Sequence, residues 1–341
     1  QRQMCIRDRC MSVQLKSEIK RVGSQVLREG LLLPVGLSFL ASGFNRRGAE
    51  IAQLTLYSRM RKKIEKKFAT YVNQSGERVD KLFAASKLDR CKTVWCLWFQ
   101  GFENAPAIVS KCVQSVKENL PDYEIVFLTE RNLHEYVTLP NNISDKYNRG
   151  LISKTHLSDI IRLFLLTEHG GIWMDSTVFL TDRPKEYQLE SPLFVFQTLS
   201  PGSSGQAIPV SSWYIEACEP SRILLLAREL LLEYWNRYNR LIDYYLVHYF
   251  ICIAAERYPE EWSRIPPVSN EAPQLLLSSL LLPFNEDRWG FIKSQSAIHK
   301  TTYKISDKEL KHDPSLTFLH SILSGEVGFF GNVETDSQQD C

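Results

Sequence analysis

The sequence lacks the glycine-rich motifs of the commonest nucleotide-binding folds. Neither G-x-G-x-x-G nor a phosphate-binding loop ending in G-K-S or G-K-T occurs among the 341 residues. This absence disfavours a dinucleotide or ATP site. The eight cysteines form no C-x-x-C pair and no regular framework, and most lie among apolar residues. We therefore expect reduced thiols in a cytoplasmic protein, without a disulfide scaffold.

A long apolar run is also missing. Residues 31–41, LLLPVGLSFLA, form an apolar stretch of 11 residues that contains Pro34 and Gly36. A membrane span needs about 20 residues, so this stretch is too short. It is not a convincing signal peptide, because it lies 20 residues behind Met11 and lacks a clean cleavage site. Two interpretations stay open: a segment that dips into a membrane interface, or a helix that packs on the body.

The net charge of +2 hides a strong asymmetry. Residues 11–90 hold 16 Lys and Arg against 7 Asp and Glu, whereas residues 91–341 carry a net charge of −9. A basic N-terminal arm on an acidic body predicts an anionic partner for the arm. Residues 31–72 are the candidate for peripheral binding at the inner face of the plasma membrane. A solvated basic helix is the equal alternative, and nucleic acid is not expected.

The two ends of the chain do not resemble the middle. Residues 1–10 include Q-M-C-I-R-D-R, which resembles translated sequencing-adapter sequence, so we expect this segment to be foreign to the protein. Residues 326–341 form a polar tail that we expect to be disordered. The domain division that follows is an arm over residues 11–90 and a body over residues 91–325.

The body alternates strand and helix patterns. Strands are predicted at residues 94–99, 124–129 and 172–174, separated by helices at 105–119 and 153–169. This order predicts an α/β fold with a parallel sheet and helices on its faces. Further elements are predicted towards the C-terminus: strands at 193–197 and 212–215, and helices at 221–238, 241–257 and 271–282.

The stretch 153–180 is the most informative part of the chain. Ser153 can cap a helix with an apolar face, and Gly170 and Gly171 supply the left-handed residues of a helix stop. The short strand that follows ends at Asp175, where ligands bind in open α/β sheets. Asp159 and Arg162 lie three residues apart on the second face of the helix. They form either a buried ion pair that fixes helix to sheet, or part of a binding site.

Two spaced motifs carry a resemblance to a known family. S-D-x-x-R at residues 158–162 and G-G-x-x-x-D at 170–175 resemble the pattern of the capsular polysaccharide synthesis proteins. These belong to a wider group with a D-x-D motif, which includes glycosyltransferase family 32 and, more distantly, the large glucosylating bacterial toxins. The resemblance covers roughly residues 90–325. It implies a GT-A-like, Rossmann-like nucleotide-sugar-binding domain with helical C-terminal additions and a helical N-terminal arm.

The resemblance also implies a donor site. Trp98 would stack on the uracil ring of a UDP-sugar, with Leu97 and Gln100 offering polar groups to the base. The alternative for Trp98, as for Trp95, is a place in the core. Asp159 and Arg162 would contact hydroxyls of the donor sugar.

A divalent cation is implied by the same motif, with one departure. Asp175 matches the first aspartate of D-x-D, but Ser176 and Thr177 follow it, so the second carboxylate is missing. Asp175 and Thr177 are the expected ligands of Mn²⁺ or Mg²⁺, both of which prefer oxygen donors. Alternatively, Asp175 binds the ion together with diphosphate oxygens and water, or binds ribose and sugar without a metal.

Two further motifs lie towards the C-terminus. S-A-I-H-K-T-T-Y-K resembles the family's H-K-L-T-Y-K, and implies that His299, Lys300 and Lys304 bind phosphate or metal. A basic surface strand is the alternative. I-D-Y-Y-L-V-H matches D-Y-x-x-x-H, which places Asp243 and His248 on the acceptor side. An amphipathic helix with a satisfied histidine is equally compatible.

The resulting hypothesis is a retaining glycosyltransferase that acts on a nucleotide-sugar donor and a glycan or lipid-linked glycan acceptor. Retention comes from the resemblance alone. The serine- and glycine-rich loop between Gln197 and Ser212 is expected to act as a lid. The competing hypothesis, motivated by Thr177, is a non-catalytic scaffold of the same fold in a polysaccharide assembly complex.

Overall fold

The computed structural model describes residues 23, 25–43, 45–199, 208–305 and 317–325. The expected foreign segment 1–10, the polar tail 326–341 and residues 200–207 of the expected lid lie outside the described residues.

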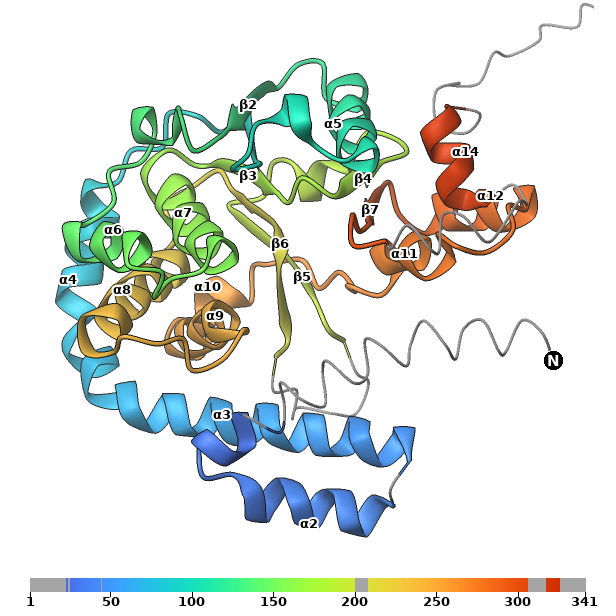
Figure 1. The fold of residues 1–341 in the computed structure, drawn as a ribbon. Helices are drawn as coiled ribbons and strands as arrows, with labels where there is room; N and C mark the ends of the chain where they lie inside the picture. Colours follow the sequence, from blue (N-terminus) through green and yellow to red (C-terminus); the bar gives the residue numbers. More distant parts are fainter. Residues whose placement is uncertain (1–22, 24, 44, 200–207, 306–316, 326–341) are drawn as a thin grey trace, which may run out of the picture.

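A mixed sheet with strand order β2-β1-β3-β6-β5 forms the centre of the fold (Figure 1). Its strands are β1 Thr93–Leu97, β2 Glu124–Leu128, β3 Gly171–Met174, β5 Leu193–Gln197 and β6 Val210–Ala217. β1 pairs in parallel with β2 and β3, whereas β6 is antiparallel to β3 and β5. The α/β prediction is confirmed. The sheet is parallel only from β2 to β3, because β5 and β6 follow each other without a crossover helix.

Helices cover both faces of the sheet (Figure 1). One side carries α4 Gly76–Ala85, α6 Asn141–Asn148, α7 Lys154–Glu168, α8 Arg222–Arg237, α9 Leu246–Arg257 and α10 Pro259–Trp262. The other side carries α5 Ala107–Asn119, α11 Leu275–Ser279, α12 Glu286–Gln295, α14 Phe318–Ser324 and an antiparallel ribbon of β4 Val178–Leu180 and β7 Ile298–Lys300. Short 3₁₀ turns are η1 Phe102–Asn104, η2 Leu133–Glu135, η3 Glu186–Gln188 and η4 Ala272–Gln274.

Two predicted helices differ from the observed ones. The helix predicted from residue 241 begins at Leu246, because the Asp243 carboxylate accepts the backbone N–H of Tyr245 at 2.7 Å and holds a turn there. The helix predicted over 271–282 is divided into η4 and α11. Pro273 lies in η4, where its missing N–H and fixed φ suit a first turn rather than a helix interior.

The N-terminal arm is packed on the body from α3 Arg46–Gln74 onward. Leu56, Met60, Ile64 and Phe68 recur every fourth residue and are buried in the same core as α7, α8 and α9. The Phe68 ring meets Phe250 of α9 edge-on at 5.2 Å. The arm and the body therefore share a core, and their division at residue 90 stays a prediction about folding units.

The apolar stretch 31–41 forms most of helix α2 Leu32–Ser42, which runs beside α3 at the bottom of Figure 1. Val35 is buried, while Leu32, Leu33, Leu37 and Leu40 are exposed. α2 is thus a helix packed against α3, which fits the second interpretation, and its outer face is apolar. In the part of the chain that the structure describes, no helix has both the length and the apolar character that crossing a membrane requires.

The junction between α7 and β3 depends on two glycines. The Ser153 hydroxyl caps α7 by accepting the backbone N–H of His156 at 3.2 Å. Gly170 and Gly171 have φ of 78° and 88°, the left-handed region that the helix stop requires. A Cβ on Gly171 would lie 2.5 Å from the Thr93 carbonyl oxygen and 2.7 Å from that of Arg90. The chain can therefore enter β3 beside β1 only with glycine here.

We expect Gly171→Ala to lower the free energy of unfolding by at least about 2 kcal/mol, from the left-handed backbone and the collision with strand β1. Gly290→Ala is the matched control, because Gly290 lies within α12 with nothing within 4 Å of an added Cβ. It should raise stability by about 0.5–1 kcal/mol. Urea unfolding followed by tryptophan fluorescence measures both. Equal stability of the two variants would contradict the close approach at Gly171.

Candidate active site

A pocket of about 670 Å³ opens beyond the carboxyl ends of β1 and β3. The structure brings most of the residues predicted from the motifs into its wall. These are Leu97, Trp98, Gln100, Asp159, Arg162, Asp175, Ser176, Thr177, His248 and Lys300.

Arg162 lies at the centre of the polar wall. Its Nη1 donates to the backbone oxygen and the hydroxyl of Ser212, at 2.5 and 2.7 Å. Its Nη2 contacts Asp159 Oδ1 at 3.2 Å and Asp175 Oδ1 at 3.5 Å, and its Nε donates to the Ser158 carbonyl. Every nitrogen of the guanidinium thus has a protein partner. The side chain, which is only 6% exposed, joins α7 to the ends of β3 and β6.

Asp159 is a buried carboxylate held in its charged form. Burial would raise the pKa of this carboxyl, but the Arg162 guanidinium and the nearby His156 ring outweigh it and hold the pKa below its usual range. The distance from His156 Nδ1 to Asp159 Oδ2 is 3.4 Å. His156 is in turn fixed by Trp235, whose Nε1 donates to His156 Nε2 at 3.0 Å.

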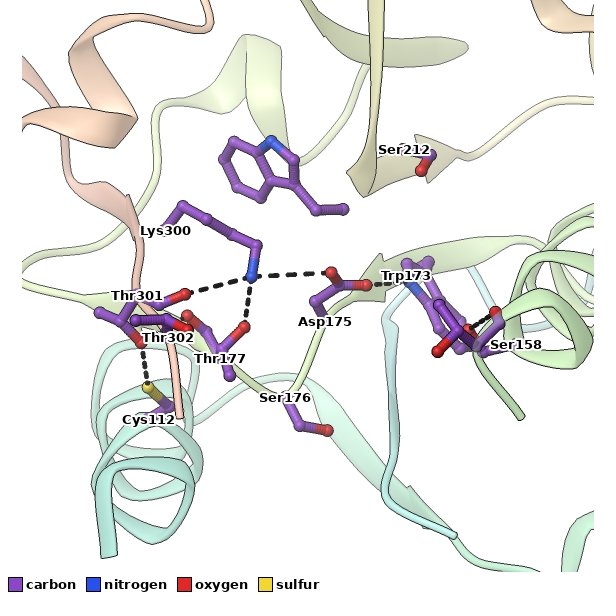
Figure 2. Close-up of polar contacts among 12 residues, drawn as sticks. Cys112, Ser158, Trp173, Asp175, Ser176, Thr177, Ser212, Lys300, Thr301 and Thr302 are labelled. Atoms are coloured by element: carbon purple, nitrogen blue, oxygen red, sulfur yellow. Dashed lines mark hydrogen bonds and ion pairs between the residues drawn. The ribbon is translucent and has the colours of Figure 1, made fainter. Parts of the chain in front are cut away.

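Asp175 follows β3 directly and lies between two cations. Its Oδ1 accepts the Trp173 indole N–H at 3.1 Å and faces Arg162. Its Oδ2 lies 3.7 Å from Lys300 Nζ. The Lys300 ammonium also contacts the Thr177 hydroxyl, and Figure 2 shows it reaching towards both residues. Ser176 points away from Lys300 and donates to the Leu97 carbonyl at 2.8 Å, which ties the ends of β1 and β3 together.

Trp95 in β1 and Trp98, which follows the last residue of β1, have different surroundings. Trp95 is fully buried and donates to the Gly170 carbonyl at 2.8 Å, so the core alternative holds for Trp95. Trp98 lines the pocket, and its ring meets Tyr303 edge-on at 5.1 Å.

Three predicted residues do not line the pocket. His299 is buried on the far side of β7, with Nε2 3.0 Å from the Thr181 hydroxyl, and burial lowers its pKa to about 4. Lys304 is exposed outside the pocket wall. The Asp243 carboxylate holds the turn before α9 and contacts Gln25. These three side chains therefore lie outside the pocket, and the buried His299 does not fit the alternative of a basic surface strand either.

His248, in α9, does line the pocket. Burial lowers its pKa to about 4, so the ring is neutral at pH 7. The Tyr245 ring meets it edge-on at 5.2 Å. A neutral imidazole can both donate and accept a hydrogen bond, which suits contact with a hydroxyl.

Several wall residues were missed from the sequence. Ser212, Trp213, Asn270, Leu54 and Tyr57 line the pocket but belong to no spaced motif, whereas Tyr244 lies inside the D-Y-x-x-x-H segment. Tyr303 could have been found, because it lies inside the H-K-T-T-Y-K segment. Leu54 and Tyr57 come from α3, which the charge pattern assigned to a separate arm.

The divalent cation implied by the D-x-D resemblance fits these residues poorly. Both expected ligands, Asp175 and Thr177, face the same Lys300 ammonium, so an ion between them would meet a like charge. Within the described ranges, no three His, Cys, Asp or Glu side chains gather in a way that could hold a metal. A cation at this position stays a prediction from the motif, and the geometry offers a lysine in its place.

Comparisons with known proteins agree with the motifs. A family model described as capsular polysaccharide synthesis protein matches residues 44–322. The chain belongs to this family, and the resemblance drawn from the two motifs is confirmed.

The individual relatives are more distant. The O-glycosyltransferase braB of Annulohypoxylon truncatum is 31% identical over 98 residues, which is 26% of this chain and 23% of that protein. Among solved structures, the PaToxG glycosyltransferase is 14% identical with a TM-score of 0.34, over 78% of this chain and 98% of its own. A glycosyltransferase involved in the glycosylation of the major capsid of PBCV-1 is 12% identical, also with a TM-score of 0.34, over 64% and 95%. With a TM-score of 0.34, neither structure supports a conclusion about this chain.

We expect Arg162→Met to lower the free energy of unfolding by about 3–5 kcal/mol at pH 7, because Asp159 would remain buried without its cation. Without Arg162, burial raises the pKa of Asp159 and the carboxyl takes up a proton as the pH falls. The loss of unfolding free energy should therefore be smaller at pH 5 than at pH 7. Urea unfolding at both pH values measures it. The double variant Arg162→Met with Asp159→Asn should lose less than the single one. If the loss of unfolding free energy were the same for the single and the double variant and at both pH values, the result would argue against a paired buried charge.

Proposed function

We propose that this protein is a glycosyltransferase of GT-A-like architecture. It transfers a sugar from a nucleoside diphosphate sugar, preferably a UDP-sugar, to a glycan acceptor in the synthesis of capsular or another surface polysaccharide. One observation carries the proposal: two carboxylates and two cations, Asp159, Arg162, Asp175 and Lys300, meet in one pocket beyond the ends of parallel strands. The volume of about 670 Å³ is in the range of small-molecule sites.

Trp98 is the proposed platform for the base. Its ring lines the pocket beside Leu97, at the end of β1. Stacking of a base on an aromatic ring contributes about 1–3 kcal/mol. The position next to the β1 end also suits a ligand bound across the carboxyl edge of a parallel sheet.

Asp159 is proposed to accept hydrogen bonds from the donor sugar, and Arg162 to position Asp159. Since protein groups already occupy each nitrogen of Arg162, its task is to hold the Asp159 and Asp175 side chains in place. A carboxylate accepts about four hydrogen bonds, so Asp159 retains sites for sugar hydroxyls after contacting Arg162 and His156.

The reaction breaks the bond between the anomeric carbon and the diphosphate oxygen, and the electron pair stays on that oxygen. The acceptor hydroxyl oxygen forms the new bond to the anomeric carbon, and its proton passes to the departing diphosphate. Retention of configuration is proposed from the family resemblance, and no side chain is assigned as a nucleophile. His248, with Tyr244 and Tyr245 beside it in the pocket wall, is proposed to hold the glycan or lipid-linked glycan acceptor.

The test offers the purified full chain a panel of nucleotide sugars and follows release of the nucleotide. We expect at least one UDP-sugar to be consumed. Asp175→Asn should lower kcat by about 10²-fold, the scale of removing a group that organises charge at the reacting centre. Trp98→Ala should raise the donor KM by about 5- to 150-fold from lost stacking. Asp287→Asn, at the exposed start of α12, is the matched control and should leave both unchanged.

The competing scaffold hypothesis predicts a different outcome. In that case a nucleotide binds, but no member of the panel is consumed with or without added glycan. Such a result would overturn the enzymatic proposal.

We also propose that the outer face of α2 rests on an anionic membrane. This helix has no charged residue, and Leu33, Leu37 and Leu40 follow one exposed stripe. Exposed basic residues of the neighbouring α3 include Arg59, Lys62 and Lys66. An apolar stripe beside basic side chains matches the chemistry of an interface with acidic lipid headgroups.

Vesicle sedimentation tests this surface with the full chain. We expect binding to vesicles that contain phosphatidylglycerol, weaker binding at high salt, and little binding to phosphatidylcholine alone. Leu33→Glu with Leu37→Glu should abolish binding, while Leu281→Glu, an exposed leucine remote from α2, should not. Binding unaffected by the double change would assign the membrane contact to another surface.

A further inference from the structure

We propose that the ammonium group of Lys300 takes the place of a divalent cation as the counter-charge for the donor diphosphate. The inference rests on the proposed function, because it concerns the same pocket and the same donor. It adds that donor binding and turnover do not require a metal ion.

The backbone positions Lys300 firmly beside the end of β3. β4 and β7 pair with Val178 opposite Lys300 and Phe179 opposite His299. Beyond this pair, the backbone N–H and the hydroxyl of Thr301 both donate to the Thr177 carbonyl, each at 2.8 Å. Alternation along the strand then turns His299 into the protein and Lys300 into the pocket. The motif residue that reaches the donor site is therefore Lys300.

The contacts of the ammonium leave it free to bind an anion. It donates to the Thr177 hydroxyl and to the Thr301 carbonyl, the latter at 3.3 Å. Asp175 Oδ2 lies 3.7 Å away, which is an ion pair but too long for a hydrogen bond. An ammonium has three protons, so one remains for a phosphate oxygen. The side chain is 20% exposed and lines the pocket, so a ligand can reach it.

The local charge balance supports the same assignment. In a D-x-D site, two carboxylates and one divalent ion sum to zero. Here one carboxylate, Asp175, and one ammonium, Lys300, also sum to zero, and Thr177 is neutral. A lysine beside a single carboxylate thus gives the same net charge as a divalent ion beside two. Thr177 is then a hydrogen-bond partner that orients the ammonium (Figure 2).

Lys300 would act by binding charge, without giving up its proton. When the bond to the anomeric carbon breaks, negative charge grows on the departing diphosphate oxygen. A fixed ammonium beside that oxygen stabilises it more strongly in the transition state than in the ground state.

Titration calorimetry on the full chain with UDP and UMP as probes tests this directly. In the presence of chelator, wild type should bind UDP, and added Mn²⁺ should change its Kd less than about threefold. Lys300→Gln should weaken UDP binding by about 10- to 100-fold, the scale of one lost charge-assisted hydrogen bond. It should leave UMP binding unchanged, because UMP lacks the second phosphate. Lys300→Arg should retain most of the UDP affinity, and Lys293→Gln, an exposed lysine of α12, should match wild type.

The outcomes separate this inference from the proposed function. If chelator abolishes UDP binding by wild type and Lys300→Gln behaves as wild type in Mn²⁺, a metal is the counter-charge and the inference is overturned, while the enzyme proposal stands. If neither nucleotide binds under any condition, the donor-site proposal itself fails. Thermal unfolding of each variant checks that a loss of binding is not a loss of folding.

Discussion

The guanidinium of Arg162 is the interaction on which the rest of the site depends. It joins α7 to the end of β3 and to β6, through Asp159, Asp175 and Ser212. A buried charge of this kind is tolerated only with complete pairing, so each partner has to occupy a defined position. The positions of two acidic side chains in the pocket are consequences of satisfying one buried cation.

Local chemistry explains why this part of the site could be predicted from sequence. The cap at Ser153, the left-handed Gly170 and Gly171, and the spacing of Asp159 and Arg162 are all short-range features. They determine that a helix ends, a strand begins, and Asp175 follows. The family model over residues 44–322 agrees with them. The parallel part of the sheet was predictable for the same reason.

Contacts between distant segments could not be predicted from these local sequence features. The H-K pair marked both His299 and Lys300, and only the pairing of β7 with β4 decides which one faces the pocket. Asp243 was predicted in the site, but its carboxylate instead holds a turn. Leu54 and Tyr57 could not be predicted, because a local pattern does not reveal which surface a helix will meet. The same holds for Ser212, which matters only through Arg162.

Helix α3 belongs both to the N-terminal hairpin and to the pocket wall. One face of this helix is buried in the main core, and Leu54 and Tyr57 on another face form part of the pocket wall. Tyr57 also meets Tyr245 edge-on at 5.1 Å, on the side of His248. The helix that packs against α2 therefore also supplies part of the pocket wall, so a displacement of α3 would move Leu54 and Tyr57 with it.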